Sequence, residues 1–226
     1  MCTIVFIPTS NHSDDFVLAH NRDESPKRAR ALPPETTKRN KRSVVMPVDG
    51  SKRGTWVYTN DEETVFLFNG GFEKHKHQPP YDRSRGKIML EVLDFSGHDE
   101  FLEQVHLDGV EPFTQLFIQH NGTQRILELV WDGTRKYIRS LEWKPFIRSS
   151  STLYNADIRW QKQVQFEEWL SKHQPNKVLD FMQNTSFEVP IVLDHPLVQT
   201  ISTTLVVREG GKNQMTYSDY LVAQAD

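Results

Sequence analysis

The residue best suited to chemistry is Cys2, the only cysteine in the 226-residue chain. The small side chain of cysteine favours removal of Met1, which would leave a thiol and a free α-amine on one residue. The amine titrates at about 7.7–8.0 and a free thiol at about 8.5, so the amine can accept the proton of its own nucleophile. We therefore predict an N-terminal nucleophile at Cys2. The alternative is a small buried apolar residue, because a lone cysteine near a chain start usually has that role.

Four consecutive polar residues, Asn21, Arg22, Asp23 and Glu24, are the best candidates to assist Cys2. Residues 2–8 and 16–21 are β-rich and are joined by a polar turn, which predicts two antiparallel strands. In that pairing the end of the second strand lies beside the start of the first. A carboxylate there can hold the amine, and polar donors can stabilise an oxyanion. The alternative is an ordinary charged turn at a strand end.

The length suits one domain, residues 1–226, with a sizeable core. The net charge of −3 does not indicate nucleic-acid binding. One cysteine excludes an intramolecular disulfide framework and a cysteine-based zinc site. No stretch reaches about 18 apolar residues, and the first residues lack the pattern of a signal peptide, so we expect no transmembrane segment and a cytoplasmic location.

Other features carry weaker indications of function. His75 and His77 are a potential metal pair, but two histidines on a loop flanked by glycine and proline are more often solvated, so we expect no metal and no cofactor. The basic segment 27–42 is either a flap over the site or a surface for acidic lipid or nucleotide. The five tryptophans are expected mostly in the core or at its rim, with Trp56 as a candidate binding residue.

The elements that must position these residues follow from hydropathy patterns and turn signals. Strands are expected at residues 2–8, 16–21, 54–60, 64–69, 114–120, 124–131, 136–143, 152–155, 202–208 and 214–220. Helices are expected from Ser84 to about Gly97 and at residues 99–107, 157–172 and 176–183. Residues 25–42 are expected to form a long loop. The buried set of the third helix is expected to be Ile158, Trp160, Val164, Trp169 and Leu170.

The order of strands, two helices, strands, two helices and strands predicts an α+β fold with segregated antiparallel sheets. Two stacked sheets with a helical layer outside each would bury the apolar faces of both sheets and of both pairs of helices. We therefore expect a four-layer αββα sandwich.

The pairing of Met1-Cys2-Thr3 with Asn21-Arg22-Asp23-Glu24 resembles the NRDE family, the transport-and-Golgi-organisation type of protein. Shorter matches span about residues 1–207. They are Gly54-Thr55-Trp56, Phe68-Asn69, Ser84-Arg85-Gly86, Tyr154-Asn155-Ala156 with Trp160, and Ser202-Thr203-Thr204. Each short match is weak alone, whereas the NRDE tetrapeptide at this distance from Met-Cys is specific.

That family is similar to the N-terminal nucleophile (Ntn) hydrolases, which have the αββα sandwich. The choloylglycine hydrolases and penicillin V acylases among them cleave linear amides with a terminal cysteine. The resemblance implies Cys2 as nucleophile, Asp23 holding its amine, and Arg22 lowering the thiol pKa by its charge. It also implies Asn155 and Asn69 as oxyanion donors.

The chain departs from the hydrolases at two places. Their second strand ends in Gly-Arg-Asn-x-Asp, whereas this chain has His20 at the arginine position, followed by the matching Asn21 and Asp23. Together with Trp56, His20 and Asn21 are the candidate binding residues. The hydrolases also tend to carry an arginine at the start of a late strand, where this chain reads Gln-Thr-Ile-Ser at residues 199–202 and has no arginine before Arg208. This loss weakens the case for full hydrolase chemistry.

Two functions remain open from the sequence. The first is a cysteine hydrolase of a linear amide or another small acyl compound. The second is a non-catalytic trafficking or carrier protein on the same fold, because the resemblance links eukaryotic members to secretory organisation, lipid metabolism and haem mobilisation. Haem therefore enters by resemblance only. A redox-sensing thiol is less favoured, because there is no second cysteine to resolve an oxidised one.

Overall fold

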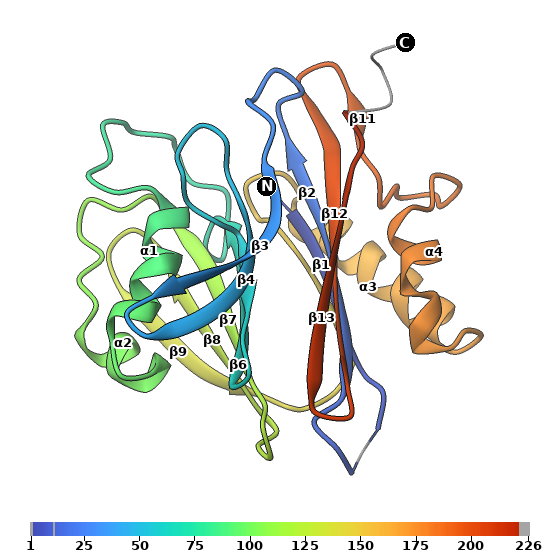
Figure 1. The fold of residues 1–226 in the computed structure, drawn as a ribbon. Coiled ribbons are helices and arrows are strands. Elements are labelled where there is room, and N and C mark those ends of the chain that lie inside the picture. The colour runs from blue at the N-terminus through green and yellow to red at the C-terminus, as the bar shows by residue number, and fades with distance from the viewer. Residues whose placement is uncertain (1, 11, 222–226) are drawn as a thin grey trace. The chain divides into compact units, whose positions relative to one another are not determined.

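The computed structural model describes residues 2–10 and 12–221, and its chain divides into two compact units (Figure 1). The first unit is Met1–Arg28 with Lys144–Asp226, and the second is Ala29–Trp143. Each unit contains one antiparallel sheet and its own helices. The predicted α+β class with two antiparallel sheets is confirmed, and each unit contains one sheet and one helical layer.

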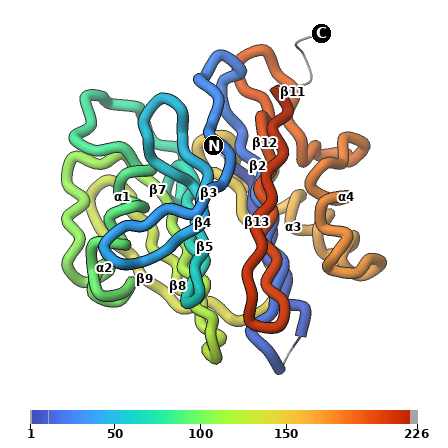
Figure 2. The backbone as a smooth tube through the Cα atoms, viewed as in Figure 1, coloured from blue at the N-terminus to red at the C-terminus, as the bar shows by residue number. Residues whose placement is uncertain are grey.

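The sheet of the first unit has the strand order β10-β1-β2-β12-β11, and β13 also pairs with β12. The bounds are β1 Cys2–Pro8, β2 Phe16–Glu24, β10 Phe146–Ser149, β11 Asp194–His195, β12 Val198–Glu209 and β13 Lys212–Asp219. The long β12–β13 hairpin can be followed in Figure 2. Its predicted turn at Gly210 and Gly211 is confirmed, and both residues have the positive φ that glycine tolerates, 56° and 78°.

Three helical segments cover one face of this sheet. They are α3 Ala156–Leu170, the 3₁₀ turn η2 Pro175–Lys177 and α4 Val178–Met182. Val5 and Ile7 of β1 belong to a buried cluster with Phe166 of α3 and Phe181 of α4. Because side chains alternate along a strand, Thr3 shares this helix-facing side. Cys2 therefore points to the opposite face of the sheet.

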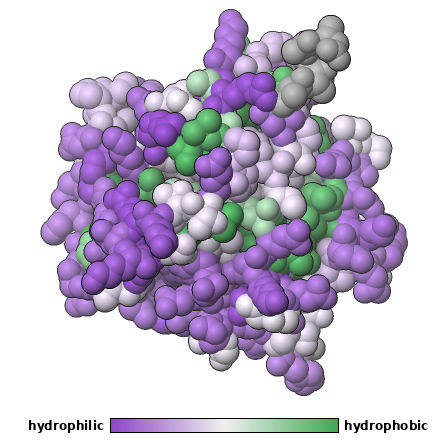
Figure 3. All heavy atoms as spheres, in the orientation of Figure 1, coloured by the Kyte–Doolittle hydropathy of each residue, from purple (hydrophilic) through white to green (hydrophobic). Residues whose placement is uncertain are grey.

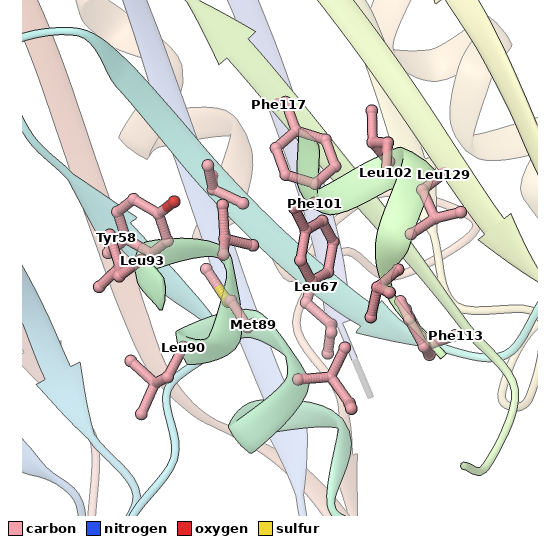
Figure 4. Close-up of a cluster of buried hydrophobic side chains, with 14 of the residues drawn as sticks. Tyr58, Leu67, Met89, Leu90, Leu93, Phe101, Leu102, Phe113, Phe117 and Leu129 are labelled. Carbon is pink, nitrogen blue, oxygen red and sulfur yellow. The ribbon is translucent and has the colours of Figure 1, made fainter. Parts of the chain in front are cut away.

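The sheet of the second unit has the strand order β3-β4-β5-β6-β7-β8-β9. The bounds are β3 Leu32–Arg39, β4 Arg42–Val48, β5 Val57–Thr59, β6 Glu63–Asn69, β7 Phe113–Gln119, β8 Arg125–Trp131 and β9 Lys136–Leu141. Its helices are α1 Arg85–Glu91, the 3₁₀ turn η1 Val92–Asp94 and α2 His98–Gln104. Figure 4 shows the core between these helices and the sheet, with Phe101 of α2 close to Phe117 of β7.

The prediction of a long loop over residues 25–42 is wrong, because β3 forms a hairpin with β4 in this segment. The turn uses Asn40 and Lys41, both with positive φ, and lysine is an unusual residue for that conformation. Pro33 and Pro34 lie within β3, which is the edge strand of its sheet, where missing amide hydrogens are tolerated. The pairing between Leu32 and Glu35 is irregular at this point.

The predicted strand at residues 152–155 is also wrong. The strand in this region is β10, and the chain then turns, with the Tyr154 amide donating to the Ser150 carbonyl at 3.0 Å. The helix at residues 157–172 is confirmed as α3, but its predicted buried set is partly wrong, because Trp160 is 68% exposed and Val164 44%. The buried face of α3 instead includes Lys162. This residue is two positions from Trp160 and two from Val164, and so lies about 200° around the helix from each of them.

On the face drawn in Figure 3 hydrophilic residues predominate, and hydrophobic ones form smaller areas among them. Over residues 2–10 and 12–221, the structure contains no helix with both the length and the apolar character needed to span a membrane.

Candidate active site

Three strands of the first unit bring three of the five predicted catalytic residues, Cys2, Arg22 and Asp23, to one end of the sheet. Cys2 of β1 pairs with Arg22 of β2, and Arg22 pairs in turn with Ser202 of β12. The next residue, Asp23, pairs with Thr200. The prediction that the end of the second strand lies beside Cys2 is confirmed. We call this end of the sheet, made by Cys2, Arg22, Asp23, Thr200 and Ser202, the Cys2 corner.

Cys2 itself is buried, with 4% of its surface exposed. Its carbonyl accepts a hydrogen bond of 2.9 Å from the Ser150 amide, which ties the start of β1 to the end of β10. Burial raises the pKa of the Cys2 thiol, Asp23 and Glu24 add to the rise, and Arg22 opposes it. Arg22 thus acts in the predicted direction, but desolvation outweighs it. A reactive thiolate at Cys2 therefore requires a local base.

Asp23 is fully buried and is held by two hydroxyl groups. Thr200 Oγ1 donates to Asp23 Oδ1 at 2.6 Å, and the Tyr154 hydroxyl donates to Asp23 Oδ2 at 3.2 Å. Burial raises the pKa of the Asp23 carboxyl, while the Thr200 hydrogen bond and the nearby Lys162 oppose the rise. Two donors to two carboxyl oxygens suit the ionised form, which can only accept.

Lys162, a fully buried residue of α3, is a cation whose charge acts on the Asp23 carboxyl. Its Nζ donates to Thr3 Oγ1 at 3.2 Å and lies 3.6 Å from the centroid of the Tyr154 ring. Thr3 Oγ1 is also 3.0 Å from Ser149 Oγ. Burial lowers the pKa of Lys162 to about 8, and the charge of Asp23 opposes the shift. A buried amine with this pKa is sensitive to pH in the physiological range.

Lys162 and Tyr154 were not predicted as site residues, although the sequence contains a signal for Lys162. It lies four residues after Ile158 and four before Phe166, which is the spacing of one helix face. In the sequence, a lysine at that position is easily interpreted as a solvent-exposed residue that interrupts the apolar face of the helix. In the structure it is instead the buried cation on which Thr3 and the Tyr154 ring converge.

Asn21 occupies the helix-facing side of β2 rather than the face of Cys2. Its Nδ2 donates to the Met182 carbonyl at 2.7 Å, and its Oδ1 accepts from Thr203 Oγ1 at 2.6 Å. It thereby connects the end of α4 to the sheet. His20 lies on the same face as Cys2 by strand alternation and is fully buried. Burial sets the pKa of His20 well below its ordinary value, so the imidazole is neutral.

Asn155 is the N-cap of α3, where its Oδ1 accepts from the Ile158 amide at 2.9 Å. Only its oxygen is engaged in that cap, so its amide hydrogens point to a separate partner or to solvent. The turn that leads to it begins at Ser150, the residue whose amide donates to the Cys2 carbonyl. Asn155 is therefore carried on the segment that leaves the Cys2 corner.

Asn69 and Trp56 belong to the second unit. Asn69 ends β6 and pairs with Phe113, while the buried Trp56 precedes β5 and accepts a hydrogen bond from the Leu67 amide through its carbonyl at 2.9 Å. Their roles as oxyanion donor and binding residue stay predictions.

In the segment where the hydrolases tend to carry a late arginine, the side chain that contacts Asp23 in this chain is Thr200. Thr200 Oγ1 donates to Asp23 and accepts from the Leu193 amide at 2.8 Å. Arg208 lies at the opposite end of β12, where it pairs with Phe16 and forms a 3.0 Å ion pair with Asp14. Arg208 therefore does not replace the missing arginine.

A family model described as Transport and Golgi organisation 2 matches residues 1–209. The chain belongs to this family. The match covers the Cys2 corner, α3, all of β12 and the whole second unit, so the family assignment rests on both units. No curated protein matches the chain.

Two similar solved structures come from the conjugated bile acid hydrolase of Clostridium perfringens. One is a mutant in which a cysteine is replaced by alanine; it is 9% identical, with a TM-score of 0.51, and the match covers 97% of this chain and 92% of that one. The other is an arginine-to-leucine variant; it is 10% identical, with a TM-score of 0.51 and coverage of 96% and 92%. At such identity the likeness concerns the fold alone, and it agrees with the predicted Ntn-hydrolase-like class.

Proposed function

We propose that the chain is an Ntn-type cysteine hydrolase that acts on a linear amide or another small acyl compound. The observation that carries this proposal is the register of the Cys2 corner, which pairs the single cysteine with Arg22, the residue that precedes the buried Asp23. The family and the fold of the similar structures support the same class of chemistry.

In the proposed reaction the Cys2 α-amine, freed by removal of Met1, takes the proton of the Cys2 thiol. The sulfur attacks the acyl carbon, and the developing oxyanion is held by Asn155, Asn69 and backbone donors. The intermediate collapses when the α-ammonium returns the proton to the leaving nitrogen, which departs as an amine and leaves a thioester. Water then attacks the thioester and gives a proton to the α-amine; that proton returns to sulfur as the carboxylic acid leaves.

Asp23 and Lys162 have positioning roles in this proposal. Asp23 holds the α-ammonium, and its own orientation is set by Thr200 and Tyr154. Lys162 limits the cost of burying the Asp23 charge by supplying a nearby cation. Asn21 and His20 support the strand that carries Asp23, with Asn21 acting through the end of α4.

The alternative is a non-catalytic carrier of a small acyl compound on the same fold. Two observations favour it: the raised pKa of the buried Cys2 thiol and the presence of Thr200 where the hydrolases tend to have an arginine. Haem stays a prediction from the resemblance and forms no part of either proposal.

Release of amine from a panel of N-acyl amides tests the hydrolase proposal. We expect turnover by protein that begins at Cys2, and none by Cys2→Ala. A form with one uncleaved residue before Cys2 keeps the thiol but lacks its free α-amine, and it should also be inactive. Binding of an acyl compound with no turnover in the Cys2-initiated protein would favour the carrier.

A further inference from the structure

Two groups of opposite charge lie on the helix-facing side of the first sheet, close to the start of β1. Thr3 pairs with Asn21, and Asp23 follows two residues later on β2, so the side chains of Thr3 and Asp23 share this side. Lys162 reaches it from α3, where its Nζ donates to Thr3 Oγ1 at 3.2 Å. Lys162 therefore contacts the residue after Cys2, and Asp23 adjoins the residue that pairs with Cys2.

Tyr154 connects this amine with this carboxyl group. Its hydroxyl donates to Asp23 Oδ2 at 3.2 Å, and the centroid of its ring lies 3.6 Å from Lys162 Nζ. Asp23 and Lys162 are both fully buried. The charge of Lys162 lowers the pKa of Asp23, and the charge of Asp23 raises the pKa of Lys162, each against the effect of burial. The two side chains are therefore an electrostatically coupled pair.

The proposed base, the α-amine of Cys2, needs such a cation. An amine beside an ionised carboxylate is stabilised as the ammonium, so Asp23 alone would raise the pKa of the α-amine. The ordinary pKa of an α-amine, about 7.7–8.0, already leaves most of it protonated at neutral pH. An α-ammonium cannot accept the proton of the thiol. A second cation on the same carboxylate opposes the rise, because like charges disfavour one another.

We propose that Lys162 keeps the Cys2 α-amine available as a base by sharing the Asp23 carboxylate with it. The inference rests on the proposed function, because it concerns the amine that takes the thiol proton there. Lys162 is a positioning residue in this account, since it acts through Asp23. When Lys162 loses its proton, at a pKa of about 8, the opposing charge disappears and the α-amine binds its own proton more strongly.

The other charged groups that act on Cys2 have a different place. Arg22 lowers the pKa of the Cys2 thiol and Glu24 raises it. Arg22 pairs with Cys2 and shares its face of the sheet, which is opposite to the helices. Asp23 is the charged group that acts on the pKa of Lys162. Arg22 and Glu24 stay unchanged in the variants below, so their effects cancel in the comparison.

The pKa of the α-amine tests the proposal without any measurement of turnover. A form of Cys2→Ala that begins at residue 2 has this amine without a neighbouring thiol, and the ¹³Cβ signal of residue 2 reports its titration. Adding Lys162→Met should raise the pKa of the α-amine by about one unit. Lys172→Met is the matched control, because Lys172 is exposed and follows the same helix, and it should leave this pKa unchanged. No rise with Lys162→Met, or an equal rise with both, would overturn the proposal.

A second measurement uses the same Cys2→Ala form with its lysines intact. The ¹³Cε signal of Lys162 and the ¹³Cβ signal of residue 2 should titrate in two shared steps, because the pKa values of coupled groups belong to the pair. Independent single-step curves would overturn the proposal even if Lys162→Met fails to fold. Since Cys2→Ala has no nucleophile, these results are separate from the amide-hydrolysis assay, and the failure of either proposal can be recognised by itself.

Discussion

Replacing Lys162 by methionine should remove a pH dependence of stability that this one buried amine creates. The ordinary pKa of a lysine, 10.5, falls to about 8 in the folded protein, because burial disfavours the ammonium more than Asp23 favours it. The folded state therefore binds fewer protons than the unfolded state between these two values. Stability rises with pH wherever the unfolded chain binds more protons, so the contribution of Lys162 must increase through this window.

The size of the effect follows from the two pKa values. They differ by about 2.5, and each pKa unit corresponds to about 1.36 kcal/mol, which gives about 3 kcal/mol over the whole window. Between about pH 7 and pH 9.5 the linkage relation gives about 2 kcal/mol of this rise. That range stops below the ordinary pKa of tyrosine, so Tyr58 and Tyr154, whose pKa values are raised, remain protonated.

The assay is urea unfolding followed by tryptophan fluorescence at a series of pH values. The difference in unfolding free energy between wild type and Lys162→Met removes the contributions of groups common to both proteins. We expect this difference to change by about 2 kcal/mol in favour of wild type from pH 7 to 9.5. Lys172→Met is the matched control, because Lys172 is exposed and follows the same helix, and its difference should be flat. A flat difference for Lys162→Met would refute the buried, pKa-shifted amine.

Three further predictions concern the same unit. Asp23→Asn should slow labelling of Cys2 by a thiol reagent by about tenfold or more if Asp23 holds the base; faster labelling would show that its effect is only the charge repulsion that raises the thiol pKa. Asn21→Ala should lower the unfolding free energy by about 2 kcal/mol, through two buried hydrogen bonds, without changing the labelling rate, as denaturation and labelling together would test. Arg208→Met should cost about 3 kcal/mol in urea unfolding, because it leaves Asp14 without its buried partner, and a loss below about 1 kcal/mol would contradict that role.

Local patterns predicted most of the fold. The turns at Asn121-Gly122 and Asp132-Gly133 correctly placed the meander of β7, β8 and β9, because Asn121, Gly122 and Gly133 adopt the positive φ that tight hairpins need. The β3–β4 hairpin was missed for the converse reason. Its turn residue Lys41 has a φ of 69°, a conformation that tertiary context imposes and that residue type does not indicate.

The candidate site shows the same division between local and long-range information. The approach of Asp23 to Cys2 followed from antiparallel pairing of two neighbouring strands. The contacts of Asp23 with Tyr154 and Thr200, in contrast, join residues 131 and 177 positions apart, and no local pattern encodes them. The burial of Lys162 likewise depends on which face of α3 meets the sheet, and the exposed Trp160 made the wrong face look more apolar.

The most direct test of the central claim is the intact mass of the natively expressed protein before and after brief exposure to a thiol-directed alkylating probe. A primed terminal nucleophile predicts a mass without the initiator methionine and one rapid addition at Cys2, at a rate well above that of free cysteine. Retained Met1, or a thiol that reacts no faster than free cysteine, would contradict the hydrolase and leave the acyl-compound carrier as the better explanation.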